Sequence, residues 1–137
     1  METNLVITNK VEELSRLAEQ VDVLAENWGL PMPLCMNINL VLEEAVSNVI
    51  FYAFEDEEKH DIEIFIALQD DQLKIEIVDD GIPFDPSKSE QADISLPIEE
   101  RPVGGLGILL ISKIMDEVLY IREDNKNKLS LMKNLQV

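Results

Sequence analysis

The chain has 137 residues, and its 11 Lys and Arg side chains face 28 Asp and Glu, which gives a net charge of −17 at pH 7. A surface this acidic repels phosphate backbones, so we expect no direct role in nucleic-acid binding. Because 46% of the residues are hydrophobic, the composition excludes a disordered acidic tail and favours one folded domain over residues 1–137.

The N-terminus and the apolar segments indicate no role in a membrane. No apolar run approaches the roughly 20 residues needed to cross a bilayer, and the first residues lack the basic start and apolar stretch of a secretory signal. The sole cysteine, Cys35, cannot form an internal disulfide, and with the sole histidine, His60, it excludes a Cys/His zinc site. We therefore expect a cytoplasmic protein.

The first half of the chain is expected to form one strand and two helices. Residues 4–8 have the composition of a short strand. Asn9 and Glu12 have the spacing of a capping box, and apolar residues then recur at helical spacing over residues 11–28. A second helix, over residues 34–54, is so apolar that we expect it to be largely buried.

The second half alternates strands with one long loop. Residues 61–68 and 73–78 alternate apolar and polar side chains, which predicts two strands joined by a hairpin. Periodicity stops between Gly81 and Gly107, and a loop this long in a compact domain is often a functional lid. A third helix is expected over residues 106–115.

Two final strands, over residues 116–122 and 128–133, are expected to be joined by a turn at residues 123–127. The predicted order is therefore β-α-α-β-β-lid-α-β-β. Strands paired through hairpins favour an α+β fold with a mostly antiparallel sheet covered on one face by three helices.

Glu44 and Asn48 lie four residues apart on the second predicted helix, so they share a face. An asparagine oxygen is a ligand suited to Mg²⁺, and a neighbouring carboxylate can accept a proton from an attacking hydroxyl. From these two residues alone, the alternative is that both side chains lie at the helix edge and contact solvent.

A second polar motif, Asp79-Asp80-Gly81, directly follows a predicted strand. A carboxylate at a strand end can accept a hydrogen bond from a ligand amine, and a glycine lets ligand and backbone approach closely. Taken alone, the motif favours an ordinary turn, because Asp-Gly is a frequent turn dipeptide.

A glycine-rich strip, formed by Gly104, Gly105, Leu106 and Gly107, enters the third predicted helix. The N-terminus of a helix offers free N–H groups and the positive end of the helix dipole to phosphate. The strip is neither a Walker A loop nor a dinucleotide fingerprint, and by itself it is also consistent with a flexible hinge.

The order of these motifs along the chain is more specific than any one of them. With them in this order, the chain resembles the GHKL (Bergerat-fold) ATP-binding family, and within it the anti-sigma factor serine/threonine kinases of bacteria. Residues 44–48 resemble the family's N box, residues 79–81 its first glycine box and residues 105–107 its second. The resemblance implies a two-layer α/β sandwich, an ATP lid at about residues 82–104 and a homodimer.

The resemblance also implies a role for each site residue. Asn48 would hold the Mg²⁺ that bridges the triphosphate. Asp79 would recognise the adenine amino group, with Gly81 beside the base. Glu44 would be the general base for a protein serine or threonine hydroxyl. The alternative of a solvated helix edge is less compatible with this set of roles.

The remaining predicted site residues lie in or beside the predicted lid. Gly104–Gly107 would supply the hinge of the lid and contacts to phosphate. Arg101 either stabilises the transferring charge or is a solvated residue of the lid. Two positions depart from the family: Tyr52 stands where relatives often carry a histidine, and Pro83 stands where many carry a second glycine. This proline stiffens the entrance to the lid.

As a whole, the resemblance implies an ATP-dependent serine/threonine protein kinase that phosphorylates a STAS-domain anti-anti-sigma factor and sequesters a sigma factor. The alternatives are a nucleotide-binding switch without kinase activity and a domain that has lost nucleotide binding. Residues 1–112 carry 24 acidic and 6 basic side chains, a balance that suits capture of a basic, DNA-binding transcription factor.

Overall fold

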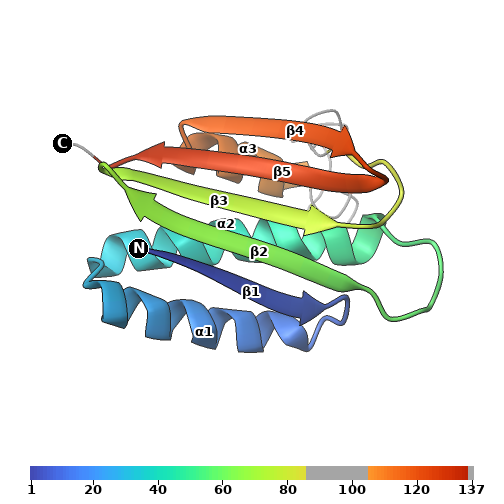
Figure 1. Ribbon diagram of the computed structural model, residues 1–137, viewed down its shortest axis with the longest axis horizontal. Coiled ribbons are helices and arrows are strands. Elements are labelled where there is room, and N and C mark those ends of the chain that lie inside the picture. Colours follow the sequence, from blue (N-terminus) through green and yellow to red (C-terminus); the bar gives the residue numbers. More distant parts are fainter. Residues whose placement is uncertain (86–104, 136–137) are drawn as a thin grey trace.

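The computed structural model describes residues 1–85 and 105–135 and shows a two-layer α+β fold (Figure 1). The predicted order of elements is confirmed. The predicted lid lies outside the described residues, except for residues 82–85. The elements are β1 (Glu2–Thr8), α1 (Glu13–Trp28), α2 (Met32–Tyr52), β2 (Asp61–Gln69), β3 (Gln72–Asp79), α3 (Gly105–Ile114), β4 (Glu117–Glu123) and β5 (Lys126–Asn134).

The sheet has five strands in the order β1-β2-β3-β5-β4, and each pair of neighbours is antiparallel. Both hairpins turn on two residues with left-handed backbone, a conformation that Asp and Asn tolerate better than most residues. The turn between β4 and β5 is therefore shorter than the predicted turn at residues 123–127. The residues with positive φ are Asp70 (53°), Asp71 (60°), Asp124 (54°) and Asn125 (62°).

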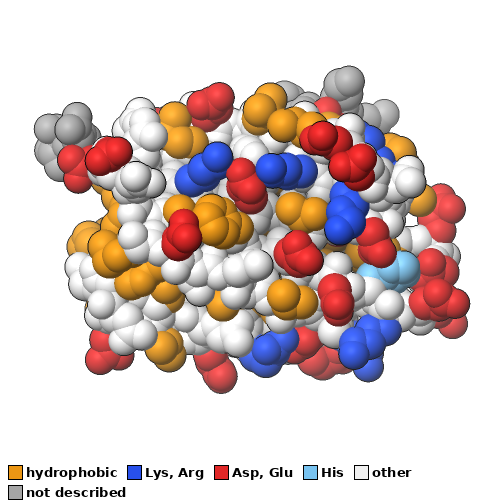
Figure 2. All heavy atoms as spheres, viewed as in Figure 1, with side chains coloured by type: hydrophobic (Ala, Val, Ile, Leu, Met, Phe, Trp, Pro, Cys, Tyr) orange, Lys and Arg blue, Asp and Glu red, His pale blue; other side chains and the backbone are white. Residues whose placement is uncertain are grey.

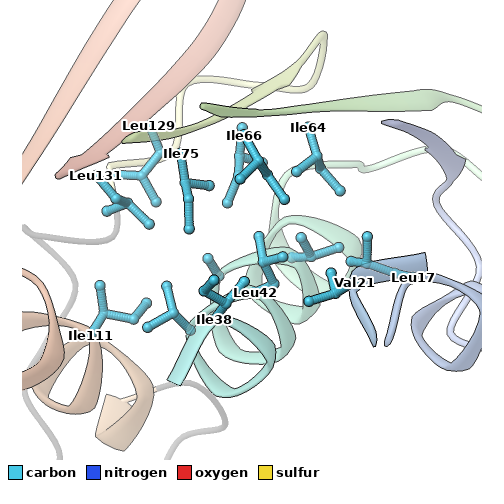
Figure 3. Packing of buried hydrophobic residues seen from close by; sticks show 14 of the residues in the cluster. Leu17, Val21, Ile38, Leu42, Ile64, Ile66, Ile75, Ile111, Leu129 and Leu131 are labelled. Atoms are coloured by element: carbon cyan, nitrogen blue, oxygen red, sulfur yellow. The ribbon is translucent and has the colours of Figure 1, made fainter. Parts of the chain in front are cut away.

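The hydrophobic core lies between the sheet and the three helices (Figure 3). Alternate residues of the central strands point toward the helices, as the period of two predicts. Figure 3 shows these strand side chains facing α2, with α1 and α3 on either side of it. The labelled residues are Ile64, Ile66, Ile75, Leu129 and Leu131 from the sheet, Leu17 and Val21 from α1, Ile38 and Leu42 from α2, and Ile111 from α3.

Helix α2 is the central helix of this layer. By length and hydropathy alone its 21 residues would suffice to cross a membrane, contrary to the expectation that no segment approaches that length. However, Ile38, Leu42 and Val46 of α2 are almost completely buried in the core. The composition of α2 is therefore accounted for by its packing against the sheet, since a helix that is apolar on most sides is typical of a buried position.

The predicted capping box at the start of α1 is wrong. Glu12 occupies the N-cap position without a side-chain capping bond, and α1 begins at Glu13. The Asn9 side chain instead donates to the Glu58 carbonyl (3.1 Å) and accepts from the His60 N–H (2.9 Å). Asn9 thus satisfies backbone groups of the irregular segment before β2, which have no partner in the sheet.

The described helices all cover one face of the sheet, and Figure 2 shows the opposite face. Acidic, basic and apolar side chains are interspersed on it. Glu76 lies 3.2 Å from the Lys74 ammonium and 3.4 Å from that of Lys128. Exposed ion pairs of this kind contribute little to the free energy of unfolding. The charged side chains of this face therefore keep it hydrated and do little to stabilise the fold. The homodimer stays a prediction.

Burial in the core predicts that substitutions at two positions of the sheet differ strongly in their effect on stability. Ile75 is fully buried, whereas Leu119 on the opposite face is 49% exposed. Ile75→Ala should lower the free energy of unfolding in urea by about 2–5 kcal/mol, because it removes buried methyl groups and leaves a cavity. Leu119→Ala, the matched control, should change it by less than about 0.5 kcal/mol. Equal losses in the two variants would contradict this packing.

Candidate functional site

The elements that carry the three sequence motifs meet at one end of the molecule. The C-terminal half of α2, the end of β3 and the start of α3 lie at this end (Figure 1). A hydrogen bond from the Ile82 N–H to the Ala53 carbonyl (2.8 Å) joins the segment after β3 to the residue that ends α2. Chain segments that are far apart in sequence therefore contribute to one site.

Asp79 is a buried carboxylate at the end of β3, and only 4% of the residue is exposed. Its Oδ1 accepts hydrogen bonds from the Gly81 N–H (2.9 Å) and from the Asn127 side chain (2.9 Å). Burial raises the pKa of Asp79, and these two donors oppose that shift. Among the described residues no hydrogen bond ends on Oδ2, so this oxygen is available to a ligand that donates.

Gly81 allows the closest backbone contact of the site. A Cβ atom at this position would lie 2.2 Å from the Ala53 carbonyl oxygen, which is inside van der Waals contact with backbone that cannot rotate away. The glycine is therefore required by its contact with the end of α2. Its predicted place beside an adenine base stays a prediction.

Asn48 and Glu44 differ in their surroundings although they lie one turn apart on α2. Asn48 is 4% exposed, and no hydrogen bond among the described residues involves its side chain. Glu44 is half-buried, and burial, followed by the charge of Glu43, raises the pKa of Glu44. A raised carboxyl pKa suits a group that must accept a proton near neutral pH. The burial of Asn48 argues against a solvated helix edge.

The surroundings of Asn48 fit a magnesium ion that is bound together with a phosphorylated ligand. Among the described residues, Gln20 Oε1 is the one fully buried polar side-chain atom without a hydrogen bond, so the Asn48 amide, which has none either, keeps some contact with solvent and can be reached by an ion. Among residues 1–85 and 105–135, no group of three or more His, Cys, Asp or Glu side chains converges on a common point. Mg²⁺ needs no such group, since it takes one or two protein ligands and completes its shell with phosphate and water.

The prediction that the glycine strip leads into a helix is confirmed. Gly105, Leu106 and Gly107 are the first residues of α3, and the first turn of this helix contains no acidic residue. Their N–H groups belong to the set that a helix leaves without intrahelical partners. Gly104 and Arg101 lie outside the described residues, so their predicted contacts with phosphate stay predictions.

Sequence reasoning missed Asn127, the third buried polar residue of the described chain. This residue lies in β5 directly opposite Asp79, whereas the sequence analysis placed it in a turn. The available signal was the alternation of β5: Asn127 shares the inward face with Leu129 and Leu131. A polar residue in an inward position has to be satisfied by a partner.

Tyr52, one of the two departures from the family pattern, contacts the start of the predicted lid. Its ring stacks on Phe84 with the ring centroids 5.7 Å apart and an interplanar angle of 22°. Stacked aromatic pairs of this kind typically add about 0.5–1.5 kcal/mol beyond burial. Phe84 directly follows Pro83, so the contact fixes this segment against the end of α2.

His60 lies beside the first glycine box and between two carboxylates. Its Nε2 is 2.7 Å from an oxygen of Asp56, and its Nδ1 is 3.1 Å from an oxygen of Asp80. The ring also stacks on Phe54 at 4.4 Å. Acidic side chains gather around the histidine in Figure 2. The hydrogen bond with Asp56, more than any other contact, raises the pKa of His60.

Comparisons with known proteins show the family to which this chain belongs. The histidine kinase-like ATPase domain family matches residues 7–133. The serine-protein kinase RsbW of Bacillus cereus (strain AH187) is 32% identical over 122 residues, which are 86% of this chain and 76% of that protein. The protein of the same name from Bacillus anthracis is 28% identical with the same coverage.

Two solved structures share the fold at low sequence identity. The structure of the RsbU and RsbW domains of a Mycobacterium tuberculosis protein has a TM-score of 0.67 and 13% identity, and it covers 98% of this chain and 32% of that one. The histidine kinase domain of the blue-light activated kinase of Erythrobacter litoralis EL346 has a TM-score of 0.53 and 15% identity, over 89% of this chain and 59% of that one.

The contact of Gly81 with Ala53 predicts that even one added methyl group is costly. Gly81→Ala should lower the free energy of unfolding by about 1–3 kcal/mol, because the backbone must move to relieve the overlap. Gly29→Asn is the control: Gly29 has a φ of 66° with open space around it, and Asn tolerates this conformation. Urea unfolding measures both, and a Gly81→Ala variant as stable as the wild type would contradict the contact.

The position of His60 predicts a dependence of stability on pH. A histidine whose pKa is raised on folding stabilises the protein below its ordinary value of 6.5, and this contribution is lost as pH rises through the folded pKa. The free energy of unfolding should therefore fall in the wild type as pH rises above 6.5 and through the raised pKa of His60. In His60→Gln this loss should be smaller, and what remains would come from Glu44 and Asp79, whose pKa values burial also raises. Parallel profiles would contradict the assignment.

Proposed function

The chain belongs to the histidine kinase-like ATPase domain family, and we propose that it is an ATP-dependent serine/threonine protein kinase that acts as an anti-sigma factor. The observation that carries the proposal is a pair of buried polar side chains, Asn48 on helix α2 and Asp79 at the end of strand β3. Each retains hydrogen-bonding capacity that the described residues do not use. No polar atom of either side chain is fully buried without a partner, so this unused capacity is within reach of a ligand.

The two ends of ATP would be bound by groups of opposite character. Oδ2 of Asp79 would accept a hydrogen bond from the exocyclic amine of adenine. The N–H groups at the start of α3, over Gly105–Gly107, would bind phosphate together with the positive end of the helix dipole. Gly104 and Arg101 would extend this phosphate site from the lid at about residues 82–104.

Asn48 would hold Mg²⁺ through its side-chain oxygen. The ion neutralises charge on the phosphates during phosphoryl transfer. The remaining chemistry is assigned to Glu44, which would accept the proton of a serine or threonine hydroxyl as the hydroxyl oxygen bonds to the γ-phosphorus and the bond to ADP breaks. The raised pKa of Glu44 supports this role, because it makes the carboxylate a stronger base.

The partners follow from the family resemblance and from charge. The curated relatives carry the name serine-protein kinase, which supports a protein serine as the acceptor. The acceptor would be a STAS-domain anti-anti-sigma factor, and the sequestered partner a sigma factor. The net charge of −17 supports capture of a basic, DNA-binding partner through electrostatic complementarity. We place the protein in the cytoplasm and expect it to act as a homodimer.

The test is phosphoryl transfer from radiolabelled ATP with Mg²⁺ to a cognate STAS-domain protein. Glu44→Gln should lower the rate of transfer by about 10²–10⁴-fold while retaining ATP, because general-base catalysis contributes about that much. Asn48→Ala should lose the Mg²⁺-dependent part of ATP binding. Glu43→Gln removes the same charge from the exposed neighbouring residue and should stay within a few fold of the wild type.

The outcomes separate the candidate functions. Label on the partner with the wild type and Glu43→Gln, but not with Glu44→Gln, supports the kinase. ATP binding without any label on the partner would instead support a nucleotide-gated switch. The absence of a heat signal when the wild type is titrated with ATP and Mg²⁺ would overturn both proposals and favour a domain that has lost its nucleotide.

A further inference from the structure

Asn127 connects the site to the hairpin of β4 and β5. Its side-chain nitrogen donates to Oδ1 of Asp79 (2.9 Å) and to the Ile82 carbonyl (2.7 Å). Its side-chain oxygen accepts from the Phe84 N–H (3.2 Å), and also from two side chains of β4, the Tyr120 hydroxyl and the Arg122 guanidinium (3.2 Å). One buried amide thus links β3, the segment that leads into the predicted lid, and β4.

These partners fix the orientation of the amide. The two groups facing the nitrogen are acceptors, and the three groups facing the oxygen are donors. Turning the amide over would bring its oxygen against a carboxylate and a carbonyl. The nitrogen and the oxygen of the Asn127 side chain are therefore both satisfied by hydrogen bonds within the protein. Among the residues of the three sequence motifs, Asn127 bonds only to Asp79.

We propose that Asn127 is a positioning residue that determines nucleotide specificity: by occupying Oδ1 of Asp79, it leaves only Oδ2 to face the ligand and selects a purine with an amine, and not a carbonyl, at C6. This inference rests on the proposed function, in which Asp79 binds adenine. An ionised carboxylate can only accept, so it favours the amine of adenine and repels the carbonyl of guanine at the same place.

The charges around Asp79 explain why this positioning matters. Asp80 follows it in sequence, and Arg122 lies on the facing hairpin, with its guanidinium donating to the Gly81 carbonyl (2.7 Å). Burial and Asp80 disfavour the ionised form, whereas the donors Asn127 and Gly81 and the charge of Arg122 favour it. Without the Asn127 donor, Asp79 would take up a proton more readily and would then offer an O–H to a carbonyl.

The experiment compares Asn127→Asp with Asn125→Asp by isothermal titration with ATP and with GTP in the presence of Mg²⁺. Both variants make the same isosteric change of charge, but Asn125 lies exposed at the tip of the hairpin turn and its left-handed backbone tolerates Asp. In Asn127→Asp the second carboxyl shares a proton with Asp79. ATP affinity should fall about tenfold or more, and the preference for ATP over GTP should shrink by about tenfold.

Asn125→Asp should match the wild type within about twofold for both nucleotides. The inference is overturned if Asn127→Asp keeps this affinity and preference, or if it loses affinity for ATP and GTP by the same factor, as a purely structural residue would. A wild type that binds neither nucleotide would refute the proposed function itself, before any variant is compared. The two failures are therefore distinguishable.

A milder variant keeps the inference testable if Asn127→Asp does not fold, as judged by circular dichroism. Tyr120→Phe removes a single oxygen that donates to the Asn127 side chain, and it leaves Asp79 and its donors in place. The preference for ATP over GTP should then shrink by about two- to fivefold. An unchanged preference in this variant would overturn the positioning role.

Discussion

The close contact between the first glycine box and the end of α2 is the constraint on which the site depends. The Ile82 N–H donates to the Ala53 carbonyl, and Gly81 leaves no room for a side chain beside the same residue. Through this contact the helix that carries Asn48 is held against the strand that ends at Asp79. The proposed site, which combines Asn48 with Asp79, requires that these two elements stay in contact.

The three buried polar residues of the described chain differ in how completely the protein satisfies them. Asn127 uses both its nitrogen and its oxygen, Asp79 uses Oδ1, and the Asn48 side chain makes no hydrogen bond with a described residue. This difference is consistent with a structural role for Asn127 and with the proposed ligand-binding roles of Asp79 and Asn48, whose polar atoms are not fully buried without a partner. It also places the unused capacity at one end of the molecule, where α3 begins.

Most of the fold follows from periodicity in the sequence, because burial on one face imposes a period of two on strands and of 3.6 on helices. Predictions failed where a distant segment decided the outcome. Asn9 has the local spacing of a helix cap, but it bonds to the backbone near His60, 51 residues away. Asn127 escaped notice because the hairpin turn before β5 has two residues and not five, which moves the asparagine into the inward register of the strand. The order of the motifs along the chain was enough to identify them. The hydrogen-bond partners of the motif residues, in contrast, depend on the register in which the strands pair.

A chain with a net charge of −17 can bind a polyanion only if the acidic side chains lie away from the groups that contact the anion. In the proposed site the negative charge of Asp79 would meet the end of the nucleotide that carries an amine, whereas backbone N–H groups would meet the phosphates and neutral Asn48 would hold the Mg²⁺ bound to them. The first turn of α3 has no acidic side chain, and burial disfavours the charge on Glu44. The acidic residues around His60 lie in the segment before β2 and at Asp80. Under this proposal, overall charge would govern which partners approach, and the neutral N–H donors at the site would govern which anion is bound.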